Sequence, residues 1–112
     1  MTDARALAWI KAVHTAVWAL FAASILAIPP LALAGRLQAA TWLALLVAGE
    51  CLVLVLNRMR CPLTDLAARH TEDRRDNFDI HLPLWLARHN KTVFGSLYLL
   101  GLLLLGWRVL LP

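Results

Sequence analysis

The chain has 112 residues, so it forms at most one domain and is too short for a core with a separate substrate domain. Hydrophobic residues make up 61% of it, well above the ~45–50% usual in soluble domains. This composition excludes a soluble globular protein and indicates an integral membrane protein whose first partner is the lipid bilayer, with no nucleic acid expected. The eleven Lys and Arg exceed the seven acids, and their positions predict an orientation.

The first long apolar segment runs from Ala12 to Ile28, and Pro29 and Pro30 follow it directly. We expect these prolines to end its helix, because proline lacks the N–H donor and clashes with the preceding turn. Ala34 then closes an Ala-Leu-Ala sequence typical of a signal-peptidase site. Because the segment is longer than the ~7–15 apolar residues of a signal peptide, we expect it to remain as a membrane span.

Two further segments are apolar and long enough to cross a bilayer, at 39–56 and 93–111. A shorter apolar run at 80–87 predicts either an interfacial helix or the first turns of a long third helix, with Pro83 tolerated in the first turn. The sequence therefore predicts an all-α membrane protein that is a single membrane domain. It would have three transmembrane helices and a cytoplasmic loop, 58–90, with short amphipathic or interfacial helices.

The basic residues are distributed very unevenly about these spans. Of the eleven Lys and Arg, nine lie before the first span or between the second and third spans. Only Arg36, between the first and second spans, and Arg108, near the C-terminus, lie on the other side of the membrane. Cytoplasmic flanks of membrane proteins carry the excess of Lys and Arg. We therefore expect a multi-pass protein of a bacterial inner (plasma) membrane, with the N-terminus and the 58–90 loop in the cytoplasm and the C-terminus outside.

The 58–90 loop is too long and too charged to be a bare turn. Between Arg58 and Ile80 its arginines and acids balance, so we expect a solvated cap with salt bridges and not a polybasic lipid-binding segment. Within it, Pro62 or Thr64 can start a short helix that continues to about His70.

Polar residues of the second span and its end share one helix face. Glu50, Asn57 and Cys61 are offset by seven and eleven residues, which places them within ~20° of one another. Glu50 lies inside the lipid, where an ionised carboxylate needs a partner or a proton. His14, near the cytoplasmic end of the first span, is the expected hydrogen-bond partner. Such a pair locks two helices together or forms a proton relay or ligand site, and both alternatives stay open.

Cys61 and the histidines are the other candidates for chemistry. Cys61 precedes Pro62 between basic residues, and a helix N-terminus with nearby positive charge lowers a thiol pKa. The alternative is that Cys61 is a small capping residue. His14 and His81 fall on the cytoplasmic side, so haem or a metal between helices is conceivable, although no two histidines have the local spacing of ligands.

Small residues repeat every four positions along the first span. The strip consists of Thr15, Ala19, Ala23 and Ala27. Small side chains allow another helix to approach closely in a membrane. The strip therefore packs the bundle or seats a partner subunit.

Several of these positions also resemble a known family. Cys-Pro-Leu-Thr at 61–64, followed by Phe78, His81 and Pro83, is similar to the small bacterial membrane proteins of DUF2784, whose function is unassigned. The resemblance implies a fold and a set of polar positions, including His14 and Glu50, but no activity. The chain departs from the family pattern in three places: Glu50 lies about one helical turn further from the cysteine, Ala67 and Ala68 replace an acidic residue, and Pro83 follows His81 more closely.

Two functions from different classes follow from these patterns. The first, which the single carboxylate in the spans favours, is a non-enzymatic accessory, assembly or interaction subunit that contacts a partner membrane protein or forms a homo-oligomer. The alternative is a redox or proton-handling site at the cytoplasmic interface that binds haem, quinone or metal. Its residues would come from the predicted polar cluster of His14, Glu50, Asn57, Cys61 and His81.

Overall fold

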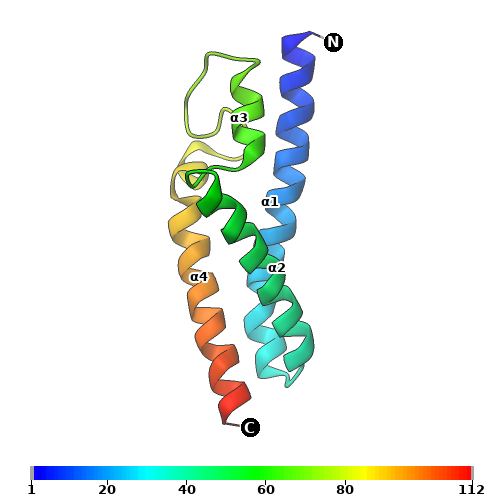
Figure 1. Ribbon diagram of the computed structural model, residues 1–112, viewed down its shortest axis with the longest axis vertical. Coiled ribbons are helices and arrows are strands. Elements are labelled where there is room, and N and C mark those ends of the chain that lie inside the picture. The colour runs from blue at the N-terminus through cyan, green and yellow to red at the C-terminus, as the bar shows by residue number, and fades with distance from the viewer. Residues whose placement is uncertain (1, 112) are drawn as a thin grey trace.

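The structure is a computed structural model that describes residues 2–111 (Figure 1). Its helices are α1 (Asp3–Leu33), α2 (Leu37–Leu56), α3 (Pro62–Ala68) and α4 (Leu84–Leu110). The three long helices alternate in direction, so the N-terminus and α3 lie at one end and the C-terminus at the other (Figure 1). Within the described residues, α1, α2 and α4 are long and apolar enough to cross a membrane. The predicted all-α fold is confirmed.

The first helix does not end at the prolines. α1 continues through Pro29 and Pro30 to Leu33, so the prediction of an end at Ile28 is wrong. The backbone groups beyond the prolines are still bonded, with the N–H of Ala34 donating to the carbonyl of Pro30 at 2.9 Å. Prolines inside apolar helices are tolerated where neighbouring packing offsets the missing hydrogen bonds. The helix ends instead where Gly35 adopts a φ of +80°, which glycine allows without strain.

The other helix boundaries lie close to those predicted. α4 begins at Leu84, and Pro83 lies just before its first residue. Of the two alternatives for the apolar run at 80–87, the structure therefore shows the first turns of a long third helix and not a separate interfacial helix. α3 begins at Pro62, as expected, and ends at Ala68, slightly before His70. Proline suits the first turn of a helix because its missing N–H donor would have no partner there.

The long helices pack tightly only in the half that is remote from α3. There Ile28 and Ala32 of α1 meet Ala40 and Ala44 of α2 and Leu105 of α4 in one buried cluster. The Tyr98 hydroxyl donates to the carbonyl of Ala44 at 2.8 Å, which links α4 to α2. Small residues let helix backbones approach closely where no water drives association.

The predicted strip of small residues is not this interface. Ala19 and Ala23 are exposed on the outside of the bundle, whereas Ala22 and Ile25 on the adjacent face are buried. The interpretation that the strip packs the bundle is therefore wrong for its central residues. They remain available on the outer surface of α1.

The close contact between α1 and α4 requires glycine at position 101. A β-carbon on Gly101 would lie 3.2 Å from Ile28 Cγ2, whereas one on Gly106 would meet nothing within 4 Å. We expect Gly101→Val to destabilise the protein by about 1–3 kcal/mol through overpacking. Thermal unfolding in detergent measures this, with Gly106→Val as the matched control. An equal loss in both variants would mean that only helix propensity had changed.

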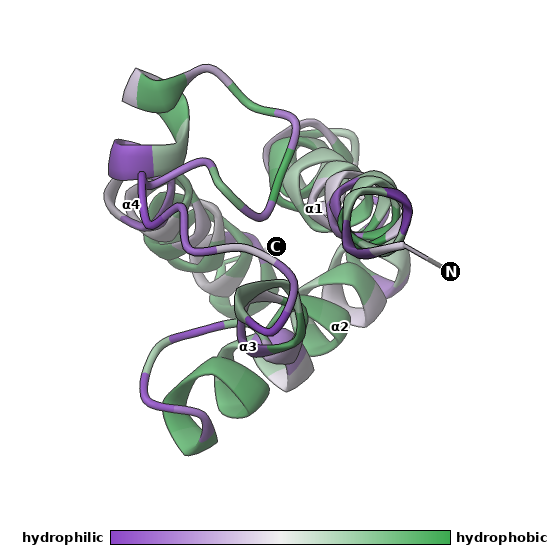
Figure 2. Ribbon diagram, turned by 90° about the horizontal axis from the view of Figure 1, so that it is seen from above, coloured by the Kyte–Doolittle hydropathy of each residue, from purple (hydrophilic) through white to green (hydrophobic). Residues whose placement is uncertain are grey.

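Polar residues gather beyond one end of the bundle. Residues 57–83, which connect α2 to α4 and include α3, form a cap over that end, and Figure 2 shows its hydrophilic segments against the hydrophobic helices. α1 has 31 residues, a length of ~46 Å, and so exceeds a hydrocarbon core of ~30 Å. Its first turns run beside the cap, where Asp3 Oδ1 lies 3.0 Å from His70 Nδ1.

Candidate functional site

The helices leave a partly open cavity of about 470 Å³ in the half of the bundle beneath the cap. This volume falls in the range of roughly 300–1,000 Å³ typical of small-molecule sites. Each long helix presents one face to it, at helical spacing, and the cap covers its outer end. The main contributions are Trp18, Phe21 and Ile25 from α1, Val47, Glu50 and Leu54 from α2, and Asn90, Phe94 and Tyr98 from α4.

The structure brings together three of the five residues of the predicted polar cluster. His14, Glu50 and Cys61 all line the cavity. Asn57 instead stabilises the start of the cap, because its Nδ2 donates to the Arg60 carbonyl at 2.8 Å and to Asp65 Oδ2 at 2.9 Å. His81 has an exposed side chain, and its backbone N–H donates to Thr15 Oγ1 at 2.9 Å. Asn57 and His81 therefore serve the fold.

His14 bonds to Asp79, so the predicted hydrogen bond to Glu50 is wrong. Its Nδ1 lies 3.0 Å from the backbone oxygen of Asp79 and 3.4 Å from Asp79 Oδ2. A carbonyl oxygen can only accept, so Nδ1 carries a hydrogen and donates it. In the neutral imidazole Nε2 is then left as an acceptor. The cap thus fixes the tautomer of a histidine that lines the cavity.

Asp79 is the buried centre of the contact between the cap and α1. Only 5% of its surface is exposed, and its carboxylate also accepts from Thr64 Oγ1 of α3. Asp79 was not among the predicted site residues. The sequence feature that could have identified Asp79 is its position between Phe78 and Ile80. An acid between two large apolar residues in a charged loop suggests a buried hydrogen-bond acceptor.

Glu50 faces the cavity without a partner. It forms neither a hydrogen bond nor an ion pair with another side chain in residues 2–111, and it is half-buried. Every fully buried side-chain nitrogen or oxygen of that part of the chain has a hydrogen-bond partner. The Glu50 oxygens are therefore not sealed off, and they are accessible to whatever occupies the cavity.

Of the two alternatives for Cys61, a reactive thiol and a capping residue, the structure favours the capping residue. Burial raises the pKa of its thiol, and this outweighs the backbone N–H groups of Leu63 and Thr64, which act in the other direction. The neighbouring Arg60 is engaged with Asp65, with Arg60 Nε 3.4 Å from Oδ1. Cys61 precedes the first residue of α3 as its cap, so the capping alternative holds.

A raised thiol pKa makes alkylation of Cys61 slow. Because the thiolate is the nucleophile, we expect iodoacetamide to react with Cys61 at pH 7.5 more slowly than with a free cysteine. The rate should rise by about tenfold per pH unit until the pH exceeds the raised pKa. Mass spectrometry of a Cys51→Ala variant, which leaves one thiol, measures it. A rate above that of free cysteine at pH 7.5 would contradict a buried thiol.

Trp18 joins α1 to α4 across the cavity. Its Nε1 donates to Asn90 Oδ1 at 2.8 Å, and its ring meets Phe94 edge-on at 5.7 Å between centroids. A buried tryptophan normally has such a partner for its N–H group. These contacts link α1 to α4 within the lining of the cavity.

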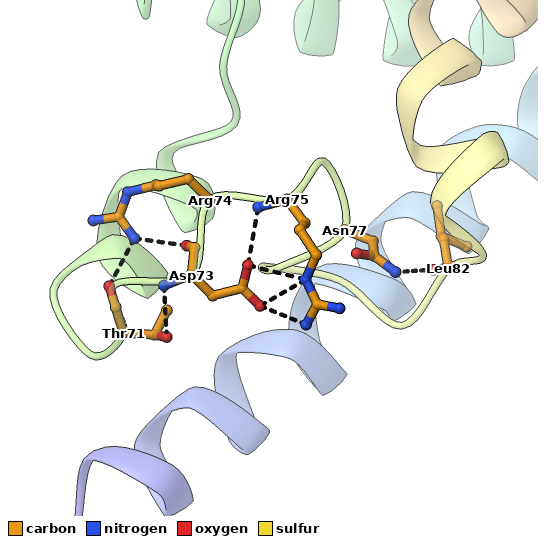
Figure 3. A network of polar contacts seen from close by, with 6 residues as sticks. All are labelled: Thr71, Asp73, Arg74, Arg75, Asn77 and Leu82. Atoms are coloured by element: carbon orange, nitrogen blue, oxygen red, sulfur yellow. Dashed lines mark hydrogen bonds and ion pairs between the residues drawn. The ribbon is translucent and has the colours of Figure 1, made fainter.

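The cap is held by its own polar contacts, several of which Figure 3 shows. Arg75 binds both carboxylate oxygens of Asp73, and these hydrogen bonds lower the pKa of Asp73 to about 2. Asn77 Nδ2 donates to the Leu82 carbonyl at 2.9 Å, and Arg88 Nε donates to Asp76 at 2.8 Å. The prediction of a salt-bridged loop is confirmed.

Metal binding finds little support in this arrangement. Within residues 2–111, no group of three His, Cys, Asp or Glu side chains lies close enough to hold a metal ion. His14 Nδ1 is already used by Asp79, and His81 lies outside the cavity, so these two histidines do not face each other as haem ligands would.

No protein-family model, curated protein or solved structure matches the chain. The resemblance to DUF2784 therefore remains a prediction from the residues. Function is inferred from the cavity and the groups that line it.

Proposed function

We propose that this chain is a multi-pass protein of a bacterial inner membrane that binds a small amphipathic molecule without transforming it. The cap and the N-terminus would lie in the cytoplasm, because they carry most of the Lys and Arg, whereas Arg36 and Arg108 stand at the other end of the bundle. The bacterial origin follows from the resemblance to DUF2784.

One observation carries the proposal: the helices pack closely in one half and separate around a cavity of about 470 Å³ in the other. Protein interiors are normally close-packed, so an unfilled space of this size forfeits contacts that a bound molecule would restore. The cavity is aliphatic and aromatic within the bundle and polar beneath the cap. It therefore suits a molecule with an apolar body and a polar end.

The chemistry of the lining favours binding over catalysis. The Cys61 thiol stays protonated and is a weak nucleophile, since burial raises its pKa. The Asp79 carboxylate is 5% exposed, accepts from Thr64 and lies 3.4 Å from His14 Nδ1, so it serves the contact between the cap and α1.

The experiment is a titration with a neutral fluorescent amphipath, N-phenyl-1-naphthylamine, into the purified protein in lipid nanodiscs. We expect a saturable increase in emission with about one probe per chain, above the linear partitioning into empty nanodiscs. Linear partitioning alone would contradict a binding cavity.

A second function, that of a subunit which contacts a partner through the membrane, is favoured by the exposed Ala19 and Ala23 on α1. Whether this partner is a second copy of the chain can be tested directly by cross-linking. Ala23→Cys should form a disulfide-linked dimer in oxidised membranes, whereas Leu20→Cys, on a bulkier neighbouring face, should not. Equal cross-linking of both would indicate random collision.

A further inference from the structure

Most charged groups around the cavity already have partners. Three cap and rim arginines form ion pairs, at 3.4 Å for Arg60 with Asp65, 2.7 Å for Arg75 with Asp73, and 2.8 Å for Arg88 with Asp76. Arg74 donates to three backbone carbonyls and lies over the ring of Phe78. Among the described charged residues that line the cavity, Glu50 and Lys91 are left without an ion pair or hydrogen bond.

Glu50 is the less exposed of these two charges. It lies six residues before the end of α2 at Leu56, which is ~9 Å inside the helix end. An ionised carboxylate at that depth requires a counter-charge or a proton. His14 is committed to Asp79 through Nδ1, so its proton on that side is not available to Glu50. The counter-charge can therefore come from a molecule in the cavity.

Aromatic rings surround the same space. Trp18 and Phe21 of α1 and Phe94 and Tyr98 of α4 line the cavity with Glu50. The faces of such rings attract cations and also bury apolar groups. A carboxylate among aromatic side chains is thus complementary to a positive charge that carries apolar substituents.

We propose that the molecule bound in the cavity is a lipophilic organic cation, such as a quaternary ammonium, a phosphonium or a protonated tertiary amine, with Glu50 as its counter-ion. The cation and a proton would compete for the Glu50 carboxylate. This inference rests on the proposed binding function and names the class of its ligand.

Other ionisable groups line the same cavity and modify this competition. They are His14 of α1, Cys51 of α2 itself, Arg88, Lys91 and Tyr98 of α4, and Arg60, Cys61, Arg74, Arg75, Asp76 and Asp79 of the cap. Lys91 would repel a cation, so Lys91→Gln should increase its affinity by a few fold. Protonation of Glu50 would remove the counter-ion, so cation binding weakens as the pH falls.

The test compares two ions of nearly equal size and shape, tetraphenylphosphonium and tetraphenylborate, by equilibrium dialysis with the protein in nanodiscs of neutral lipid. We expect the wild-type protein to bind the cation at least tenfold more tightly than the anion. Glu50→Gln should lose at least tenfold of cation affinity. Asp76→Asn removes an acid at the rim and should change it less than threefold.

Protonation gives a second readout. Cation affinity should fall by up to about tenfold per pH unit below the pKa of Glu50, and Glu50→Gln should make this slope clearly shallower. Binding of neutral N-phenyl-1-naphthylamine to Glu50→Gln shows that the variant is folded. Equal affinity for both ions, tighter binding of the anion, or no cation binding would overturn the inference. The binding function would still stand if the neutral probe saturates the cavity.

Discussion

Asp79→Ala should release the cap from α1. The substitution removes the carboxylate that accepts from Thr64 Oγ1 and lies 3.4 Å from His14 Nδ1, while the backbone contact to His14 remains. Loss of a buried, hydrogen-bonded charge that pairs two elements costs about 3 kcal/mol. Because this energy holds the cap closed, the open population should rise on the order of 100-fold.

Limited trypsin digestion of the protein in nanodiscs measures this opening, since Arg74 and Arg75 lie in the cap. Asp76→Ala is the matched control. Asp76 is an acid of the same cap whose ion pair with Arg88 is about half exposed, and such a pair contributes no more than ~1 kcal/mol. Similar cleavage rates in the two variants would show that Asp79 is not the centre of the contact.

Gly95→Phe should abolish ligand binding. Gly95 lines the cavity, and a β-carbon there would meet nothing within 4 Å, so a phenyl ring can be accommodated without displacing the backbone. The ring would occupy part of the space that the bound molecule needs. We expect at least a tenfold loss of N-phenyl-1-naphthylamine affinity, measured by the fluorescence titration.

Gly106→Phe is the control for this substitution, because Gly106 also has open space around its added β-carbon but lies outside the cavity. It should bind the probe like the wild-type protein. A loss in both variants would indicate a general effect of phenylalanine on α4, and no loss in either would place the probe elsewhere.

The helices could be predicted from the sequence because each is a long apolar run, and hydropathy alone identifies such runs. The end of α1 could not be predicted from the sequence. Pro29 and Pro30 are strong helix breakers in water, but here the chain continues until Gly35 supplies the conformation that ends a helix. The i to i−4 hydrogen bonds resume beyond the prolines, with Ala34 bonded to Pro30, and helix periodicity contains no information about this continuation.

The candidate site could be predicted only in part. Glu50, His14 and Cys61 do line one cavity. The predicted helical stripe from Glu50 to Cys61 is wrong, however, because α2 ends at Leu56 and Arg58 and Met59 adopt positive φ before Cys61. The partner of His14 was missed because Asp79 is 65 residues away and reaches it through the fold of the cap, which no local pattern encodes. The sequence left two alternatives open for Cys61, because the burial that raises its thiol pKa cannot be read from neighbouring residues.

The central claim, that the cavity beneath the cap holds a small molecule, is tested most directly by native mass spectrometry of the protein released from its own membrane. We predict one added small-molecule mass per chain for the wild-type protein and for Gly106→Phe, and its absence from Gly95→Phe. A wild-type chain that carries no added mass, or the same occupancy in all three proteins, would contradict the claim.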